Sequence, residues 1–157
     1  MEVDSNFLGP AALAKSYRFV SDPRDDADSE RLTKLNEYGG VWDCTRCLKC
    51  VEVCPKGVAP MDRIMSLREK VMESGHTNTN GARHANAFVD SVKHSGWLNE
   101  LMLPIKSFGI FNIKAMIALI PTGIRAQLNG KRPPLIHKKI SGVENVRRIF
   151  EKVENKK

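Results

Sequence analysis

The sequence predicts an all-α fold, and three observations support this. Apolar residues recur every three or four positions in several segments, which is the spacing of one helix face. No segment alternates apolar and polar residues clearly enough to predict a strand. Proline and glycine stand at the ends of the helical segments, where they start and stop helices. With 157 residues, 41% apolar and 27% charged, the chain fits one globular domain or one domain with an appendage.

Two helices are predicted before the cysteines. Pro10 occupies a favourable first helical position, and the apolar residues that follow at helical spacing are Leu13, Tyr17 and Val20. An acidic turn over 21–29 separates this helix from a second one over 30–38. The residues that share one side of the second helix are Leu32 and Leu35. We expect this helix to end at the two glycines 39–40.

Two further helices are predicted after the cysteines. Pro60 opens one that ends at Gly75, and the residues that share its apolar face are Ile64, Leu67 and Val71. The polar segment 76–81 separates it from a helix that ends at Gly96. The apolar residues of that helix are Ala85, Phe88, Val89 and Val92.

The last third of the chain predicts two amphipathic helices. Asn112 caps the first, whose apolar stripe consists of Ile113, Met116, Ile117, Ile120 and Ile124. Pro121 is expected to kink or end it. The stripe could lie in a membrane interface, or it could pack against the protein core or a partner. Of these alternatives we favour packing against the core or a partner. Residues 141–144 match a capping box, and the apolar side of the following helix consists of Val143, Val146, Ile149, Phe150 and Val153.

Charge is unevenly distributed along the chain, whose net charge is +7. Residues 1–43 carry five Lys or Arg against nine Asp or Glu, whereas residues 130–157 carry nine against three. The basic end suits anionic lipid or an acidic partner surface, or it is simply a solvated face. We expect no nucleic-acid partner, because the basic excess lacks interleaved aromatic residues.

No segment of the sequence resembles a membrane span or a signal peptide. A span needs about 20 uninterrupted apolar residues, and the best segment, 107–124, contains Lys114 and Pro121. The first ten residues are acidic and lack the apolar region of a signal peptide. Any membrane association is therefore expected to be peripheral.

All four cysteines lie within eleven residues, at Cys44, Cys47, Cys50 and Cys54, in the order C-x2-C-x2-C-x3-C-P. This is too dense for a disulfide framework, which ties separate loops together, so the cysteines are predicted metal ligands. Zinc sites usually bring ligand pairs from two separate loops. Consecutive ligands therefore favour an iron-sulphur cluster, with zinc or a ligand-free motif as alternatives. In the ferredoxin pattern with this spacing, three cysteines hold one 4Fe-4S cluster and the fourth ligates a neighbouring cluster.

Three strings around the cysteines carry a family resemblance: LGPAALAKSYRFVSDPRDD, SERLTKLNEYGGVWDC and CVEVCPKGVAP. Over residues 7–70 the chain resembles the C-terminal half of the iron-sulphur subunit of succinate dehydrogenase and fumarate reductase. The resemblance implies a helical ferredoxin domain over 1–75, followed by a helical extension over 76–157 with a basic tail. It also implies electron transfer between a flavoprotein subunit and a quinone-reactive membrane subunit, at the cytoplasmic face of the membrane. We expect no catalytic site within this chain, since its residues suggest no nucleophile with an adjacent base and no phosphate loop.

The resemblance further implies an earlier cysteine run and a plant-ferredoxin-like domain upstream. The sequence contains neither, so we expect it to be a fragment, a truncated gene product or one piece of a split subunit. The upstream segment is an expected partner. It supplies the last ligand of the cluster held by Cys44, Cys47 and Cys50, while Cys54 ligates the upstream cluster.

Cys47 departs from the usual family pattern, C-x5-C-x3-C-P, in which this position is not cysteine and the cluster has three irons. Its presence implies a four-iron cluster, and similar members work with a heterodisulfide-reductase-like membrane subunit. The family histidine associated with quinone is replaced by Thr45, which argues against direct quinone contact by this chain. The alternatives are a heterodisulfide-reductase-type small iron-sulphur subunit and a zinc-stabilised interaction module without redox function.

Overall fold

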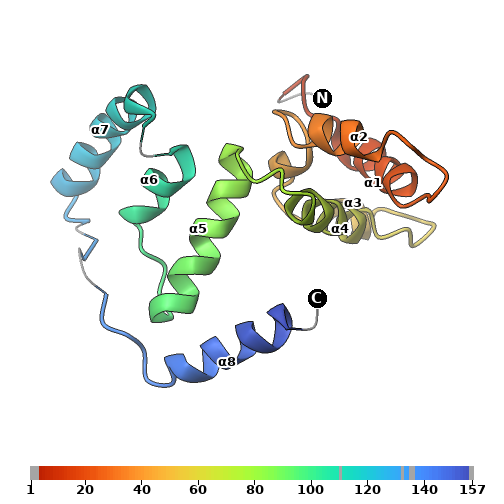
Figure 1. Cartoon of the computed structure of the whole chain (residues 1–157). Coiled ribbons are helices and arrows are strands. Elements are labelled where there is room, and N and C mark those ends of the chain that lie inside the picture. Colours follow the sequence, from red (N-terminus) through yellow and green to blue (C-terminus); the bar gives the residue numbers. More distant parts are fainter. Residues whose placement is uncertain (1–3, 110, 132, 135–136, 156–157) are drawn as a thin grey trace. The chain divides into compact units, whose positions relative to one another are not determined.

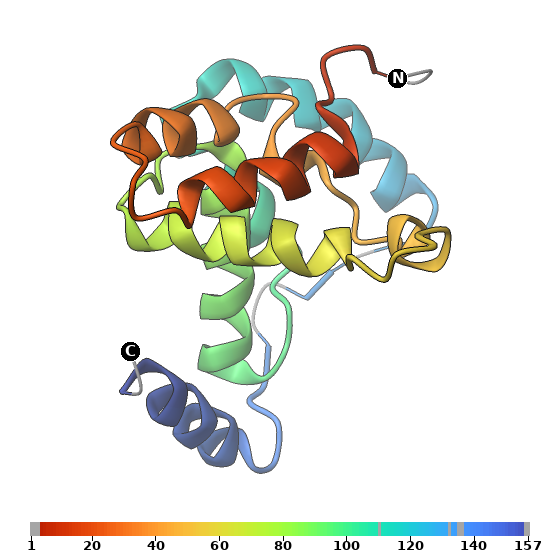
Figure 2. The same ribbon diagram turned by 90° about the vertical axis from the view of Figure 1, so that its right-hand side faces the viewer.

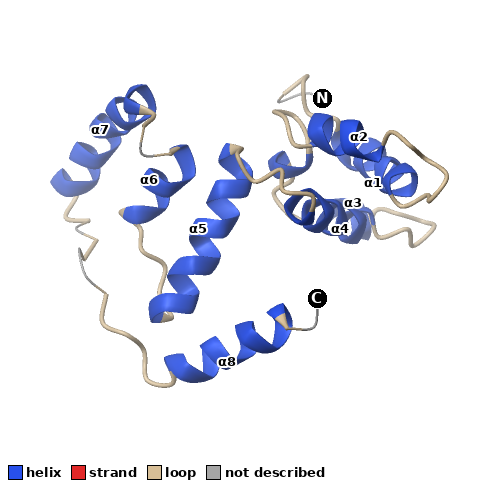
Figure 3. Cartoon of the chain, in the orientation of Figure 1, coloured by secondary structure: helices blue, strands red, loops and turns tan. Residues whose placement is uncertain are grey.

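Every regular element in the described part of the chain is a helix (Figure 1, Figure 3), which confirms the predicted all-α fold. The structure, a computed structural model, describes residues 4–109, 111–131, 133–134 and 137–155. Its elements are α1 (Gly9–Val20), α2 (Asp28–Leu35), the 3-10 turn η1 (Val41–Asp43), α3 (Lys49–Glu52), α4 (Pro60–Glu73), α5 (Asn80–Ser95), α6 (Met102–Phe108), α7 (Ile113–Leu128) and α8 (Val143–Glu154).

The chain divides into two compact units, Met1–Ala82 and Arg83–Lys157. The division expected from the sequence lies between residues 75 and 76, so the structure groups 76–82 with the cysteine-bearing unit. The assignment of the two parts as a ferredoxin domain and a helical extension remains a prediction.

A hydrogen-bond network centred on Asn36 holds residues 76–82 to the first unit. The Asn36 side-chain amide donates to the His76 carbonyl at 2.9 Å. Its carbonyl oxygen accepts from the Trp42 indole at 2.6 Å and from the Thr79 hydroxyl at 3.0 Å. Asn36 is buried, and a buried amide is tolerated because it is hydrogen-bonded on both sides. The network therefore also fixes the Trp42 ring just before the cysteines.

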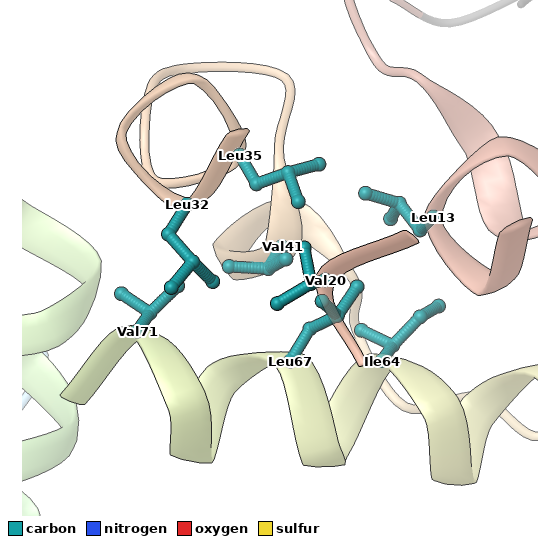
Figure 4. Packing of buried hydrophobic residues seen from close by; sticks show 8 residues of the cluster. All are labelled: Leu13, Val20, Leu32, Leu35, Val41, Ile64, Leu67 and Val71. Atoms are coloured by element: carbon teal, nitrogen blue, oxygen red, sulfur yellow. The ribbon is translucent and has the colours of Figure 1, made fainter. Parts of the chain in front are cut away.

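The core of the first unit lies between α1, α2 and α4, and α1 runs alongside α4 (Figure 2). The buried side chains that meet there are Leu13, Val20, Leu32, Leu35, Val41, Ile64, Leu67 and Val71 (Figure 4). This confirms the apolar faces predicted for the three helices, although α2 lies slightly earlier than the predicted range 30–38. Val41 belongs to η1, so the entry to the cysteine loop is itself anchored in the core.

We expect Leu67→Ala to lower the free energy of unfolding by about 2–5 kcal/mol, because truncation at a fully buried position leaves a cavity. Urea denaturation followed by circular dichroism measures the change. Leu8→Ala is the control, since the Leu8 side chain is 49% exposed. Equal losses in the two variants would contradict the place of Leu67 in the core.

Several predicted helix ends are confirmed. Pro10 and Pro60 lie in the first turns of α1 and α4. The Asn112 side chain caps α7 by accepting from the Ala115 N–H at 3.2 Å. Gly96 directly follows α5 with a φ of 77°, a left-handed conformation that glycine adopts without strain.

Two other expectations about helix ends have different outcomes. Pro121 was expected to kink or end its helix, and it does not end α7, which continues to Leu128. The carbonyl that it leaves without a donor lies one turn earlier on an exposed stretch, where water can satisfy it. The capping box expected over 141–144 does not form. Gly142 takes the N-cap position with a φ of 85° and α8 begins at Val143, which leaves the expected capping serine outside the cap.

In the second unit, α8 is tied to the C-terminal end of α5. The Arg147 guanidinium donates to the Lys93 carbonyl at 3.3 Å and to the His94 carbonyl at 3.1 Å. The Ile140 N–H donates to the Ser95 carbonyl at 3.0 Å. The last carbonyls of a helix have no partner within it, so these bonds both satisfy the end of α5 and position α8.

The apolar face predicted for α5 is not the buried one. Phe88 and Val89 are exposed, whereas Ala87 is buried. Near its start α5 is also joined to α6, where Arg83 donates to the Ser107 carbonyl at 3.0 Å.

α7 buries none of its residues. The isoleucines of its predicted stripe, which are Ile113, Ile117, Ile120 and Ile124, are 54–68% exposed. The part of the preferred interpretation that placed this stripe against the protein core is therefore wrong, while its contact with a partner stays a prediction. Among the residues that the structure describes, no helix combines the length and apolar character needed to cross a membrane.

Candidate metal centre

The cysteine run forms a curled loop between η1 and α4. Arg46 and Leu48 have φ values of 57° and 63°, in the left-handed region that side chains rarely adopt. These two residues flank Cys47, so the backbone bends sharply on both sides of this cysteine. Strained residues of this kind gather in loops that grip ligands.

Three of the four cysteines line one pocket. Cys44, Cys47 and Cys50 all border a cavity of about 840 Å³. Its apolar walls include Phe7, Pro10, Val53, Met61 and Ile64. Among the described residues, Cys54 does not belong to this lining. The structure thus brings three predicted ligands to one space and leaves the fourth outside it.

All four cysteines are available as ligands, since they are free thiols, with Cys47 exposed and the others half-buried. Within the described ranges, no three Cys, His, Asp or Glu side chains lie close enough together to hold one metal ion. Structural zinc needs four ligands around one point, whereas each thiolate of an iron-sulphur cluster binds a different iron.

Cys54 lies in a turn whose backbone N–H groups surround its sulphur. Hydrogen bonds from the backbone N–H groups of Val58 and then Lys56, with a smaller contribution from Gly57, lower the pKa of the Cys54 thiol. Burial opposes this effect. The thiolate is the form that binds metal, so the turn prepares this sulphur to act as a ligand.

Arg68 of α4 holds the entry to the cysteine loop. Its guanidinium donates to the Val41 carbonyl at 2.8 Å, the Cys44 carbonyl at 2.7 Å and the Trp42 carbonyl at 3.2 Å. It also lies 5.2 Å from the centroid of the Trp42 ring. The side chain is buried, and this burial lowers the pKa of the guanidinium. The positions of Val41 and Cys44 are thereby fixed to a core helix.

The sequence reasoning missed Arg68, although a signal was present. Arg68 stands four residues after Ile64 and directly after Leu67, on the face predicted to be buried. A charged residue on such a face must find polar partners inside the protein. The nearest available partners are the backbone carbonyls of the chain that enters the metal-binding loop.

Comparison with known proteins agrees with this geometry. Residues 10–58, which include all four cysteines, match the 4Fe-4S dicluster domain family. The chain is 31% identical over 132 residues to the 8-methylmenaquinol:fumarate reductase iron-sulfur subunit of Wolinella succinogenes, covering 83% of this chain and 40% of that protein. The chain is thus similar to the iron-sulphur subunits of fumarate reductase and succinate dehydrogenase, which confirms the resemblance seen in its sequence.

Other iron-sulphur subunits are similar over shorter segments. The fumarate reductase iron-sulfur subunit of Escherichia coli O6:H1 is 45% identical over 58 residues, which cover 37% of this chain and 24% of that protein. The succinate dehydrogenase iron-sulfur subunit of Coxiella burnetii is 37% identical over 67 residues, which cover 43% of this chain and 28% of that protein. The chain thus spans less than half the length of the relatives it matches. No solved structure matches it.

Proposed function

We propose that this chain is an electron-transfer subunit of a succinate dehydrogenase or fumarate reductase complex. It relays electrons between a flavoprotein subunit and a quinone-reactive membrane subunit. The observation that carries this proposal is the grouping of Cys44, Cys47 and Cys50 around one pocket within a 4Fe-4S dicluster domain. The similarity to a fumarate reductase subunit over 132 residues supports it.

In this proposal Cys44, Cys47 and Cys50 hold a 4Fe-4S cluster. Such a cluster exchanges single electrons at a potential set by burial, nearby charge and hydrogen bonds to its sulphurs. The sequence has no cysteine beyond the four in this run, so the last thiolate is expected from the upstream cysteine run that the family resemblance implies.

Cys54 ligates the neighbouring cluster, whose other ligands lie on the upstream segment. Two observations support this role. Cys54 is not among the described residues that line the pocket shared by the other three cysteines. The backbone N–H groups of Val58, Lys56 and Gly57 favour its thiolate form, and hydrogen bonds to sulphur are one of the means by which proteins set cluster potentials.

We further propose that the membrane partner is a heterodisulfide-reductase-like subunit and that the complex lies at the cytoplasmic face of the membrane. The extra cysteine at Cys47 supports this choice of partner, because it distinguishes the run from the usual family pattern. Thr45 stands where the family has a histidine associated with quinone. Its presence supports a quinone site that lies on the partner subunit and not on this chain.

Anaerobic reconstitution of the full chain with iron and sulphide tests this function, both alone and with a separately supplied upstream cysteine segment. We expect poor cluster incorporation by the chain alone and full incorporation with the segment. Incorporation is measured as broad visible absorption that bleaches with dithionite and a paramagnetic reduced state. Tight zinc binding without bleaching would instead indicate a non-redox module.

Two cysteine variants separate the two cluster sites. With the upstream segment present, Cys50→Ser is expected to lose the cluster held in the pocket. Cys54→Ser is expected to keep that cluster and lose the neighbouring one. A full, stable cluster on the isolated chain that depends on all four cysteines would contradict the shared ligation.

A further inference from the structure

α7 presents an apolar stripe to solvent. The residues of this stripe follow one another at helical spacing and are 54–81% exposed: Ile113, Ile117, Ile120, Ile124 and Leu128. Phe111, two residues before the helix begins, is 96% exposed. Solvent-exposed isoleucines in a continuous row are costly in water, and such patches usually mark a contact surface.

The isoleucine stripe is a second apolar face of α7. The half-buried residues of the helix lie on a different side and are also apolar: Ala115, Met116, Leu119 and Ala126. This less exposed side is available for the contact of α7 with α6, so the stripe is not needed for that contact. A helix that is apolar on both sides requires a non-aqueous surface on the side facing away from the protein.

The charge around the stripe is of one sign. From Leu101 to Val143 the sequence contains no Asp or Glu, and its Lys and Arg residues are Lys106, Lys114, Arg125, Lys131, Arg132, Lys138 and Lys139. Lys114 and Arg125 are exposed and lie next to the stripe on the helix surface. Their long apolar stems can lie along the stripe while their charged groups reach outward. The surface that covers the stripe is therefore apolar within and negatively charged at its edge.

We propose that α7 lies in the interface of a bilayer that contains anionic phospholipids. The isoleucine stripe enters the boundary of the acyl chains, and Lys114 and Arg125 contact the headgroups. The helix lies on the membrane and does not cross it, in agreement with its length and interior proline. This inference goes beyond the proposed function, in which a separate subunit provides the attachment to the membrane.

A lipid surface suits these observations better than a groove on a partner protein. The polar rim of a protein interface usually offers groups of both signs. A run of 43 residues without a single carboxylate instead matches a surface that is anionic everywhere, because the headgroups repel any acidic residue placed near them.

Co-sedimentation of the full chain with vesicles tests the proposal. The vesicles contain either phosphatidylcholine with phosphatidylglycerol or phosphatidylcholine alone. We expect binding to the anionic vesicles that weakens as salt is raised. Ile117→Glu with Ile120→Glu should weaken binding by about a hundredfold or more, since each isoleucine favours an apolar phase by roughly tenfold or more.

The matched control carries the same two glutamates on α8, as Ile149→Glu with Val153→Glu. These side chains are also exposed, at 62% and 56%, so the change in net charge and in apolar surface is similar. We expect this control to bind nearly as well as the unmodified chain. Circular dichroism verifies that both variants keep their helix content.

Three results would overturn the proposal. The first is equal loss of binding in the α7 and α8 variants. The second is equal binding of the unmodified chain to both kinds of vesicle. The third is no binding to anionic vesicles, which would point to a partner protein as the occupant. Lys114→Gln with Arg125→Gln gives an independent readout, because it should weaken binding and reduce its salt dependence while leaving the stripe intact. None of these measurements depends on a bound cluster, so they stand apart from the test of the proposed function.

Discussion

Cys47→Ser is expected to convert the four-iron cluster in the pocket into a three-iron cluster. Cys44 and Cys50 remain on the pocket wall in this variant, and the run then reads C-x5-C-x3-C-P, the pattern that the family associates with three irons. A serine hydroxyl is a poor substitute because the thiolate is the iron ligand. Iron and sulphide analysis, together with electron paramagnetic resonance of the oxidised protein, measures the change after reconstitution with the upstream segment.

Thr45→Ser is the control for this experiment. Thr45 lines the same pocket but carries no thiol, so its replacement should leave the iron content unchanged. If Cys47→Ser keeps four irons and a diamagnetic oxidised state, Cys47 is not a ligand. The structure gives a reason to expect a local effect, since Cys47 is exposed and its removal leaves no cavity in the core.

Arg68→Ala is expected to lower the free energy of unfolding by about 3 kcal/mol and to weaken retention of the cluster. The substitution removes three hydrogen bonds that the charged guanidinium donates. The carbonyls of Val41, Trp42 and Cys44 then lose this donor. Urea denaturation measures the stability, and the rate of iron loss to a chelator measures retention. Arg68→Lys should recover only part of both, because an ammonium group lacks the planar set of donors that bridges several acceptors.

Arg63→Ala is the matched control on the same helix. Arg63 is exposed, and its guanidinium lies 5.5 Å from the centroid of the Tyr17 ring, a contact worth about 0.5–1 kcal/mol at an exposed site. It should therefore cost much less stability and leave iron retention unchanged. Similar effects of the two alanine variants would show that Arg68 does not hold the cysteine loop.

The predictions that succeeded rest on local physics. Leu13, Leu32 and Ile64 were expected to face inward because helical spacing places them on one side of their helices, and all three are buried. Pro10 and Pro60 were expected near helix starts because the missing N–H of proline has no partner there in any case. Such signals need no knowledge of the rest of the chain.

The predictions that failed required knowledge of what packs against a helix. The periodicity of α7 is the same whether its isoleucines face a core or face outward, and only the structure shows them exposed. Phe88 and Val89 were expected inside, but they are exposed and Ala87 is buried instead. Helical spacing describes one helix, whereas burial depends on its neighbour.

The sequence by itself determined the all-helical class, the core residues that the helices of the first unit contribute and the four cysteine ligands proposed here, because helix periodicity and ligand spacing are local properties. Only the tertiary structure decided that Cys44, Cys47 and Cys50 border one pocket while Cys54 is not among its described lining residues. It alone revealed Arg68 as the side chain that holds the loop. The physical reason is that the pocket and this contact both join the cysteine loop and η1 to α4, which lies further along the chain. A pattern within one segment cannot predict which carbonyls a guanidinium of another segment will contact.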